Sequence, residues 1–158
     1  MGTGPPLTPP ELEFLAGART AVLATIAADG APRLLPICFV AIVTAAGLDL
    51  YTPIDEKPKK VDDPLALGRV RDVLARPGVH VLVDRWSEDW SRLGWLRIDG
   101  RAELVGPDVA ESDAREDRSV AVDALRAKYP QYATHDLESR PVIRIAIDRA
   151  LSWGNLGA

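Results

Sequence analysis

The sequence has little that could form a redox or metal centre on its own. Cys38 is the only cysteine among 158 residues, so the chain can form no internal disulfide and no cysteine-cluster zinc site. His80 and His135 are the only histidines, and neither lies in a metal-binding spacing such as H-E-x-x-H. We therefore expect no metal site, a cytoplasmic protein, and a Cys38 that packs as a small core residue rather than acting as a nucleophile.

Long apolar runs and excess positive charge are also missing. The longest uncharged run, residues 34–48, contains Pro36 and is shorter than the roughly 20 residues that span a bilayer. The net charge of −4 argues against nucleic acid as a partner, because binding a phosphate backbone needs a broadly basic face. There is also no glycine-rich dinucleotide fingerprint and no nucleophile elbow. Any site for an anion must therefore be local.

What remains is typical of one mainly β domain over residues 1–158. Six segments are rich in strand-forming residues: 20–27, 32–43, 48–52, 79–84, 95–105 and 141–148. Asp29-Gly30 between the first two is a strong hairpin signal, and the third follows closely, so the pattern predicts an antiparallel meander. Together they predict an α+β protein built on a six-stranded antiparallel β-barrel with a few flanking helices.

The fifth segment contains a second Asp-Gly pair, Asp99-Gly100, that could also form a hairpin. However, Leu96, Ile98, Gly100 and Ala102 continue one apolar alternation through the pair. An unbroken period of two predicts a single long strand with Gly100 on its inner face.

Three regions indicate helices. Residues 8–18 begin with a Thr8 cap and a Glu11 that completes a capping box. A second helix is predicted from Asp63-Pro64 to about Ala75. Residues 107–130 form a polar insertion followed by a helix near 120–129, and the low apolar content of 108–118 is compatible with a weak helix or a mobile insertion.

The segment "LYTPIDEKPKK" gathers three lysines, Lys57, Lys59 and Lys60, in an acidic chain. Such a cluster can simply solvate a loop, or it can bind an anion, since the lysine ammonium is a compact charge suited to phosphate. Asp55 and Glu56 would repel a phosphate, so we expect them to point away and to pair with basic neighbours.

The segments "ATIAADGAPRLLPICF", "LYTPIDEKPKK", "RPGVHVLVDRWSEDWSRLGWLRIDG", "AKYPQY" and "PVIRIAIDRALSWG" occur in an order that resembles one family. They are similar to the split β-barrel flavoenzyme superfamily that includes pyridoxamine 5'-phosphate oxidases. The resemblance is closer to its deazaflavin branch, which uses cofactor F420, and it covers about Phe14 to Gly154.

The resemblance implies a homodimer with the cofactor in a groove at the subunit interface. The backbone around Leu35, Pro36 and Ile37 would contact the ring system. Lys57 and Lys59 would bind the phosphate, with Lys60 adjacent and able to meet the oligoglutamate tail. The chain departs from the family in placing lysine where many relatives have arginine.

Four tryptophans, Trp86, Trp90, Trp95 and Trp153, are compatible with either core packing or a cofactor groove. Similar proteins place an aromatic residue beside the groove at the start of the fifth strand, so Trp95 is the expected wall residue. Trp90 would cover the groove from a loop.

The function that the resemblance implies is hydride transfer between F420 and a small organic substrate, with solvent or a tyrosine such as Tyr132 as the proton donor. Two alternatives remain open. An enzyme that uses flavin mononucleotide (FMN) would employ the same phosphate site. A non-catalytic cofactor carrier would explain why no clear acid or base is present.

Overall fold

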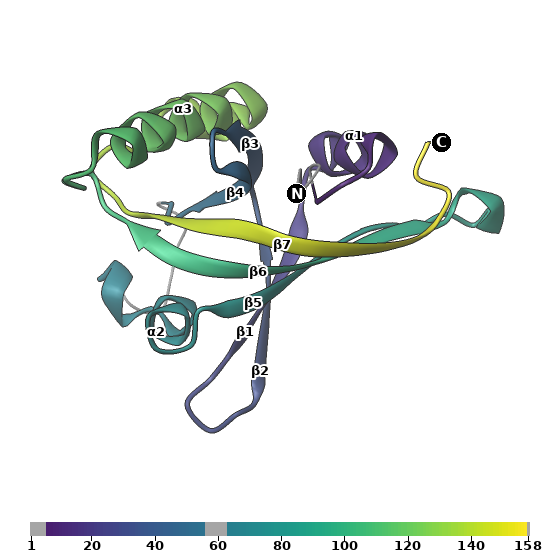
Figure 1. Cartoon of the computed structure of the whole chain (residues 1–158), viewed down its shortest axis with the longest axis horizontal. Helices are drawn as coiled ribbons and strands as arrows, with labels where there is room; N and C mark the ends of the chain where they lie inside the picture. Colours follow the sequence, from purple (N-terminus) through teal and green to yellow (C-terminus); the bar gives the residue numbers. More distant parts are fainter. Residues whose placement is uncertain (1–5, 56–62, 158) are drawn as a thin grey trace.

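The computed structural model describes residues 6–55 and 63–157, which form an antiparallel sheet with three flanking α-helices (Figure 1). The strands are β1 (Ala21–Ile26), β2 (Pro32–Ile37), β3 (Val40–Thr44), β4 (Gly47–Pro53), β5 (Gly78–Arg85), β6 (Gly94–Val105) and β7 (Val142–Gly154). The α-helices are α1 (Pro9–Gly17), α2 (Gly68–Ala75) and α3 (Ser112–Lys128), with 3-10 turns η1 (Pro64–Ala66), η2 (Trp90–Arg92) and η3 (Pro130–Ala133). The predicted α+β class is confirmed.

The prediction of six strands is wrong, because the expected strand 32–43 is two strands. The chain leaves the ladder at Cys38 and Phe39, and the backbone N–H of Phe39 donates to the Tyr129 hydroxyl at 3.0 Å. That hydroxyl lies 2.9 Å from the carbonyl oxygen of Phe39. A residue 90 positions away thus satisfies the backbone groups that a continuous strand would have paired, and no local break signal marks the site.

The sheet order, β2-β1-β5-β6-β7-β4-β3, also differs from the predicted meander. The hairpin β1–β2 forms as expected, with Gly30 at a φ of +84°, which glycine adopts without strain. β3 pairs with β4 instead of β2, so β2 and β3 become opposite edges of the sheet. In the part of the chain that the structure describes, these two edges do not pair, and the sheet is not closed.

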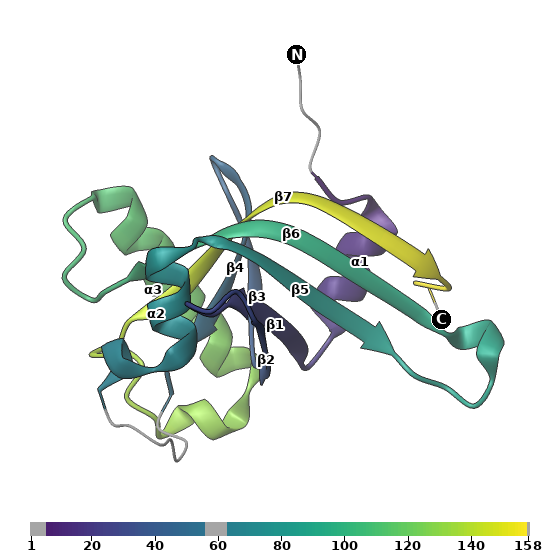
Figure 2. The same ribbon diagram turned by 90° about the horizontal axis from the view of Figure 1, so that it is seen from below.

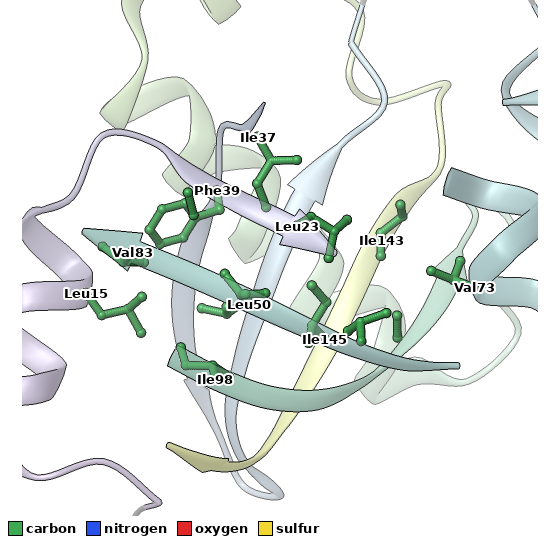
Figure 3. Close-up of a cluster of buried hydrophobic side chains, with 14 of the residues drawn as sticks. Leu15, Leu23, Ile37, Phe39, Leu50, Val73, Val83, Ile98, Ile143 and Ile145 are labelled. Carbon is green, nitrogen blue, oxygen red and sulfur yellow. The ribbon is translucent and has the colours of Figure 1, made fainter. Parts of the chain in front are cut away.

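The main hydrophobic core lies inside the curved sheet (Figures 2 and 3). The side chains of Leu23, Leu50, Val83, Ile98, Ile143 and Ile145 converge there from strands far apart in the sheet order, joined by Phe39 from the break between β2 and β3, Leu15 of α1 and Val73 of α2. Burial of this apolar surface is the main force holding the two halves of the sheet against each other.

A second core lies between α3 and the strands β3 and β4. On β4, Leu50 points into the main core and Tyr51 packs with Val122 and Leu125 of α3, so the strand is buried on both faces. The segment 108–118 is helical from Ser112 onward. Arg118, which is buried, donates to the carbonyl oxygens of Leu137, Glu138 and Arg140.

The remaining helices follow local signals. Thr8 caps α1, and its backbone N–H donates to Glu11 at 2.9 Å in the capping box. Asp63 caps η1, and the chain straightens at Leu67 before α2 begins. None of the helices in the described ranges combines the length and apolarity needed to cross a membrane.

The long fifth segment is one strand, β6, as the alternation predicts. Its inner face buries Leu96, Ile98, Gly100 and Ala102, and its pairing with β7 shifts register between Asp99 and Gly100. A Cβ placed on Gly100 would lie 2.6 Å from the carbonyl oxygen of Ala146 and 2.8 Å from Cγ2 of Ile145. Close approach of β7 therefore requires glycine here.

Replacing Gly100 tests this close packing. Gly100→Ala should lower the free energy of unfolding by about 1–3 kcal/mol, and Gly100→Leu by more, because β7 must move away. Gly78→Ala on the neighbouring strand is a matched control, since a Cβ at that position would meet no atom within 4 Å. Urea denaturation of the three variants gives the comparison. Equal stability of Gly100→Ala and the parent would contradict the assigned packing.

Candidate functional site

The residues predicted to contact a cofactor ring lie on an edge strand. β2 pairs with β1 on one side, and no described strand pairs with its other side. Ile37 is buried and Leu35 packs against the main core, whereas Pro36 is exposed on the outer face. The outer backbone edge of β2, rather than its side chains, is therefore available for hydrogen bonds with a planar ligand.

The outer face of the sheet beside β2 carries several exposed apolar side chains, and no described helix covers it. One row across the strands runs from Pro36 through Val22, Leu82 and Arg97 to Leu151. The exposed apolar side chains on this face are Leu34, Leu82, Leu151 and Trp153, of which Leu34 is 66% and Trp153 54% exposed. Charged side chains lie among them, since Arg97 is part of this row and Asp99 pairs with His80 and Arg149. Exposed apolar side chains gathered on one face are typical of an interaction surface.

Trp95 lies on the same outer face but not beside β2. It pairs with Asp84 of β5 and Trp153 of β7. Three strand spacings of about 4.8 Å separate β6 from β2, so Trp95 is about 14 Å or more from Pro36 along the sheet. Within one chain, the structure does not bring Trp95 to the predicted ring site.

Trp90 is farther away, in the turn between β5 and β6, which projects beyond the rest of the sheet (Figure 1). Its side chain is 74% exposed. The turn is well defined, because Arg85 donates from Nε to the carbonyl oxygen of Arg92 at 3.0 Å and Asp89 caps η2. Trp90 is thus held out toward solvent and cannot cover β2 of its own chain.

Lys57, Lys59 and Lys60 lie outside the described residues, so their predicted role is not tested. The residue before this segment that the structure places is Asp55, which is buried and accepts a hydrogen bond from the Tyr132 hydroxyl at 2.8 Å. Asp55 points away from solvent, as expected; its carboxylate bonds to a tyrosine, and Arg140 donates to its backbone carbonyl oxygen at 3.4 Å.

Tyr132 is poorly placed to donate a proton to a substrate. It is 1% exposed and packs against the ring of Tyr129. Burial raises the pKa of Tyr132, and the hydrogen bonds with Asp55 and Cys38 raise it further. Its hydroxyl is therefore a protonated, enclosed group that joins η3 to the end of β4, and the structure does not support Tyr132 as a proton donor.

An arginine cluster that sequence reasoning missed lies between the β1–β2 hairpin and α2. Asp72, which is buried, accepts from Nε of Arg33 at 2.7 Å and from the hydroxyl of Thr25 at 2.7 Å. Burial alone would raise the pKa of the Asp72 carboxyl, but these hydrogen bonds lower it overall. The run "GRVRDVLAR" in α2 was the available signal, but only the fold adds Arg33 to it.

These arginines line a surface cavity of about 520 Å³. Its lining includes Arg33, Arg71, Arg76, Asp29 and Asp72. Guanidinium groups around a cavity of this size suit a phosphate or carboxylate ligand. In contrast, the residues that the structure describes contain no group of three His, Cys, Asp or Glu side chains placed to hold a metal ion.

Comparison with known proteins identifies the family. The model of the pyridoxamine 5'-phosphate oxidase family matches residues 7–154, nearly the whole chain. The chain belongs to this family. A search of curated proteins gave no match.

Solved structures share the fold of this family member. A conserved hypothetical protein from Mycobacterium tuberculosis is 21% identical with a TM-score of 0.65, and the match covers 94% of this chain and 85% of that one. A FAD-binding protein from Mesorhizobium loti is 24% identical with a TM-score of 0.58, covering 89% and 87%. An F420 reductase is 17% identical with a TM-score of 0.60, covering 88% and 94%.

Beside the break between β2 and β3, Lys128 lies in a partly buried position. Its Nζ donates to the carbonyl oxygen of Phe39 at 3.0 Å and lies 4.1 Å from the centre of the Phe39 ring. Burial, together with the nearby charge of Arg19, lowers the pKa of Lys128 to about 8. The neutral form of this lysine is therefore accessible at mildly alkaline pH.

Lys128 should make the protein more stable as the pH rises through 8. Between its folded pKa of about 8 and the unfolded value of 10.5, the unfolded chain holds a proton that the folded chain has released. Rising pH then favours folding, by about 1–2 kcal/mol once the half-exposed position is allowed for. The effect is measured as the difference between parent and Lys128→Met in urea denaturation at pH 7.5, 8.5 and 9.5. Parallel pH profiles of the two proteins would contradict it.

Proposed function

We propose that the protein is an F420-dependent oxidoreductase that transfers a hydride between the deazaflavin and a small organic substrate. The observation that carries the proposal is the continuity of an open strand edge, β2, with an arginine-lined cavity at its hairpin end. The open edge of β2 suits a planar ring with polar edges, and the arginine-lined cavity suits a long anionic tail. Membership of the pyridoxamine 5'-phosphate oxidase family supports it, as does the fold shared with an F420 reductase.

The donor set of the chain fits this cofactor. The backbone of Leu35, Pro36 and Ile37 would hold the ring, and Lys57 and Lys59 would hold the phosphate. Gly68 at the start of α2 leaves room for the guanidinium of Arg33, because a Cβ there would lie 2.7 Å from Cζ of Arg33. When bound, the deazaflavin supplies the hydride chemistry, and the protein binds it, orients it and shapes access to it.

The proposal includes a homodimer that uses the bare outer face. Leu34, Leu82, Leu151 and Trp153 would be buried between two copies, leaving the β2 edge at the rim of the interface. Trp95 and Trp90 do not reach β2 of their own chain, so a second copy would bring these indoles to the groove. A homodimer would therefore allow both tryptophans to contact the cofactor, although each lies far from β2 of its own chain.

Titration with F420 and with FMN tests the function. Binding of F420, followed by oxidation of the reduced cofactor in the presence of enones or quinones, would support it. Tight binding of FMN alone would favour a flavin enzyme on the same fold. Binding of F420 without turnover of any electron-poor substrate would favour a cofactor carrier. Failure to bind either cofactor would refute all three functions: the F420 enzyme, the FMN enzyme and the carrier.

Lysine substitutions test the phosphate site. A charge-assisted hydrogen bond contributes about 1.5–3 kcal/mol, so Lys57→Ala or Lys59→Ala should weaken cofactor binding roughly tenfold to a hundredfold. Lys60→Ala should weaken binding of long-tailed F420 more than that of a tail-less deazaflavin. Fluorescence quenching gives the dissociation constants. If all three variants bind the cofactor with the affinity of the parent, the lysine cluster is not a phosphate site and only solvates a loop.

Light scattering tests the homodimer. At micromolar concentration the parent should have twice the chain mass of 17.1 kDa. Leu151→Lys should shift it toward the monomer, because a charge would be buried in the interface. Val43→Lys is the control, since Val43 is also an exposed apolar residue but lies on β3, at the other edge of the sheet. A monomeric parent that binds cofactor with full affinity would contradict the dimeric site.

A further inference from the structure

Three arginines converge on the cavity between the β1–β2 hairpin and α2, in a chain whose net charge is −4. We propose that this cavity is the subsite for the carboxylates of the cofactor's glutamate tail, with Arg71 as a direct ligand and Arg33 and Arg76 beside it. This inference rests on the proposed function, because it requires a cofactor on β2.

Two of the arginines are fixed in orientation by the protein. Nε of Arg33 donates to Asp72 at 2.7 Å, and Nε of Arg76 donates to the carbonyl oxygen of Ile26 at 2.8 Å. Within the described ranges, the terminal nitrogens of Arg33 form no hydrogen bond, and Nη2 of Arg76 lies 3.9 Å from Asp72. Guanidinium groups held by one nitrogen and free at the others are preorganised for an anion.

The two aspartates of the cavity do not cancel this positive charge. Asp72 is buried, and its carboxylate already accepts hydrogen bonds from Arg33 and Thr25. Asp29 accepts a hydrogen bond from the backbone N–H of Ala31 within the hairpin turn. The side chain of Arg71 is exposed and forms no hydrogen bond or ion pair with any described residue. One full positive charge at the mouth of the cavity is thus available to a ligand.

The position of the cavity suits the tail rather than the ring. Arg33 is two residues from Leu35 on β2, about 7 Å along the strand. Figure 1 and Figure 2 show α2 beside the β1–β2 hairpin, and α2 follows the lysine segment in the chain. A chain of γ-linked glutamates leaving the β2 edge would pass the cavity, whose volume of about 520 Å³ can hold several carboxylates.

Substitution of Arg71 distinguishes a role in binding a ligand from a role in holding the fold together. Arg33 and Arg76 join the hairpin to α2, so their loss would disturb the fold as well as any ligand. Arg71 makes no such contact, and Arg71→Gln should melt with the parent. Arg101→Gln is the matched control, because Arg101 is exposed on β6, away from this cavity.

The experiment measures dissociation constants by fluorescence quenching for long-tailed F420, for a tail-less deazaflavin and for FMN. Arg71→Gln should weaken binding of long-tailed F420 about three- to tenfold, as expected for one exposed ion pair supported by neighbouring arginines. Binding of the tail-less deazaflavin should not change. The loss should shrink at higher salt, because exposed charges are screened over about 10 Å at 0.1 M.

Two results would overturn the subsite. One is an unchanged affinity of Arg71→Gln for long-tailed F420, and the other is an equal loss for all three cofactors, which would indicate a change in the fold or a contact with the shared phosphate. Both results leave the proposed function intact as long as the parent binds F420. Failure of the parent to bind any deazaflavin would instead refute the proposed function itself.

Discussion

The hydrogen bonds between Tyr129 and the backbone of Phe39 are the contact on which the architecture depends. They stabilise the point where the chain leaves β2 and begins β3, and they attach that point to the end of α3. Because the ladder stops there, β2 and β3 become opposite edges of one curved sheet instead of neighbours. The open edge of β2, where we place the cofactor ring, exists only because of this break.

Helix coverage then divides the outer surface of the sheet into two parts. α3 packs on β3 and β4 and buries Tyr51, so that part is a second core. No described helix covers the outer face beside β2, where Leu34, Leu82, Leu151 and Trp153 remain exposed. Such an apolar face is costly to leave in water, which is why we assign it to a second copy of the chain and place the cofactor at its rim.

Buried charged groups in this protein hold elements together, whereas Arg71, the proposed direct ligand of the tail, is exposed. Asp72 accepts from Arg33 and Thr25, and Nη2 of Arg118 donates to the carbonyl oxygens of Leu137 and Glu138, so each joins distant segments. Leaving such a buried group without a partner would destabilise the fold strongly. Arg71, at the mouth of the cavity, carries no such structural contact. This separation allows binding residues to be changed without unfolding the chain, and it makes the site testable.

The sequence by itself determined the features that depend on near neighbours in the chain. The capping box of Thr8 and Glu11, the Asp29-Gly30 hairpin and the long strand through Gly100 each follow from spacings of a few residues. Tertiary structure alone decided the break at Phe39, the strand order and the meeting of Arg33 with α2. These features depend on partners far apart in the chain, such as Arg33 with Asp72 or Phe39 with Tyr129, whose pairing energies appear only once the core has formed.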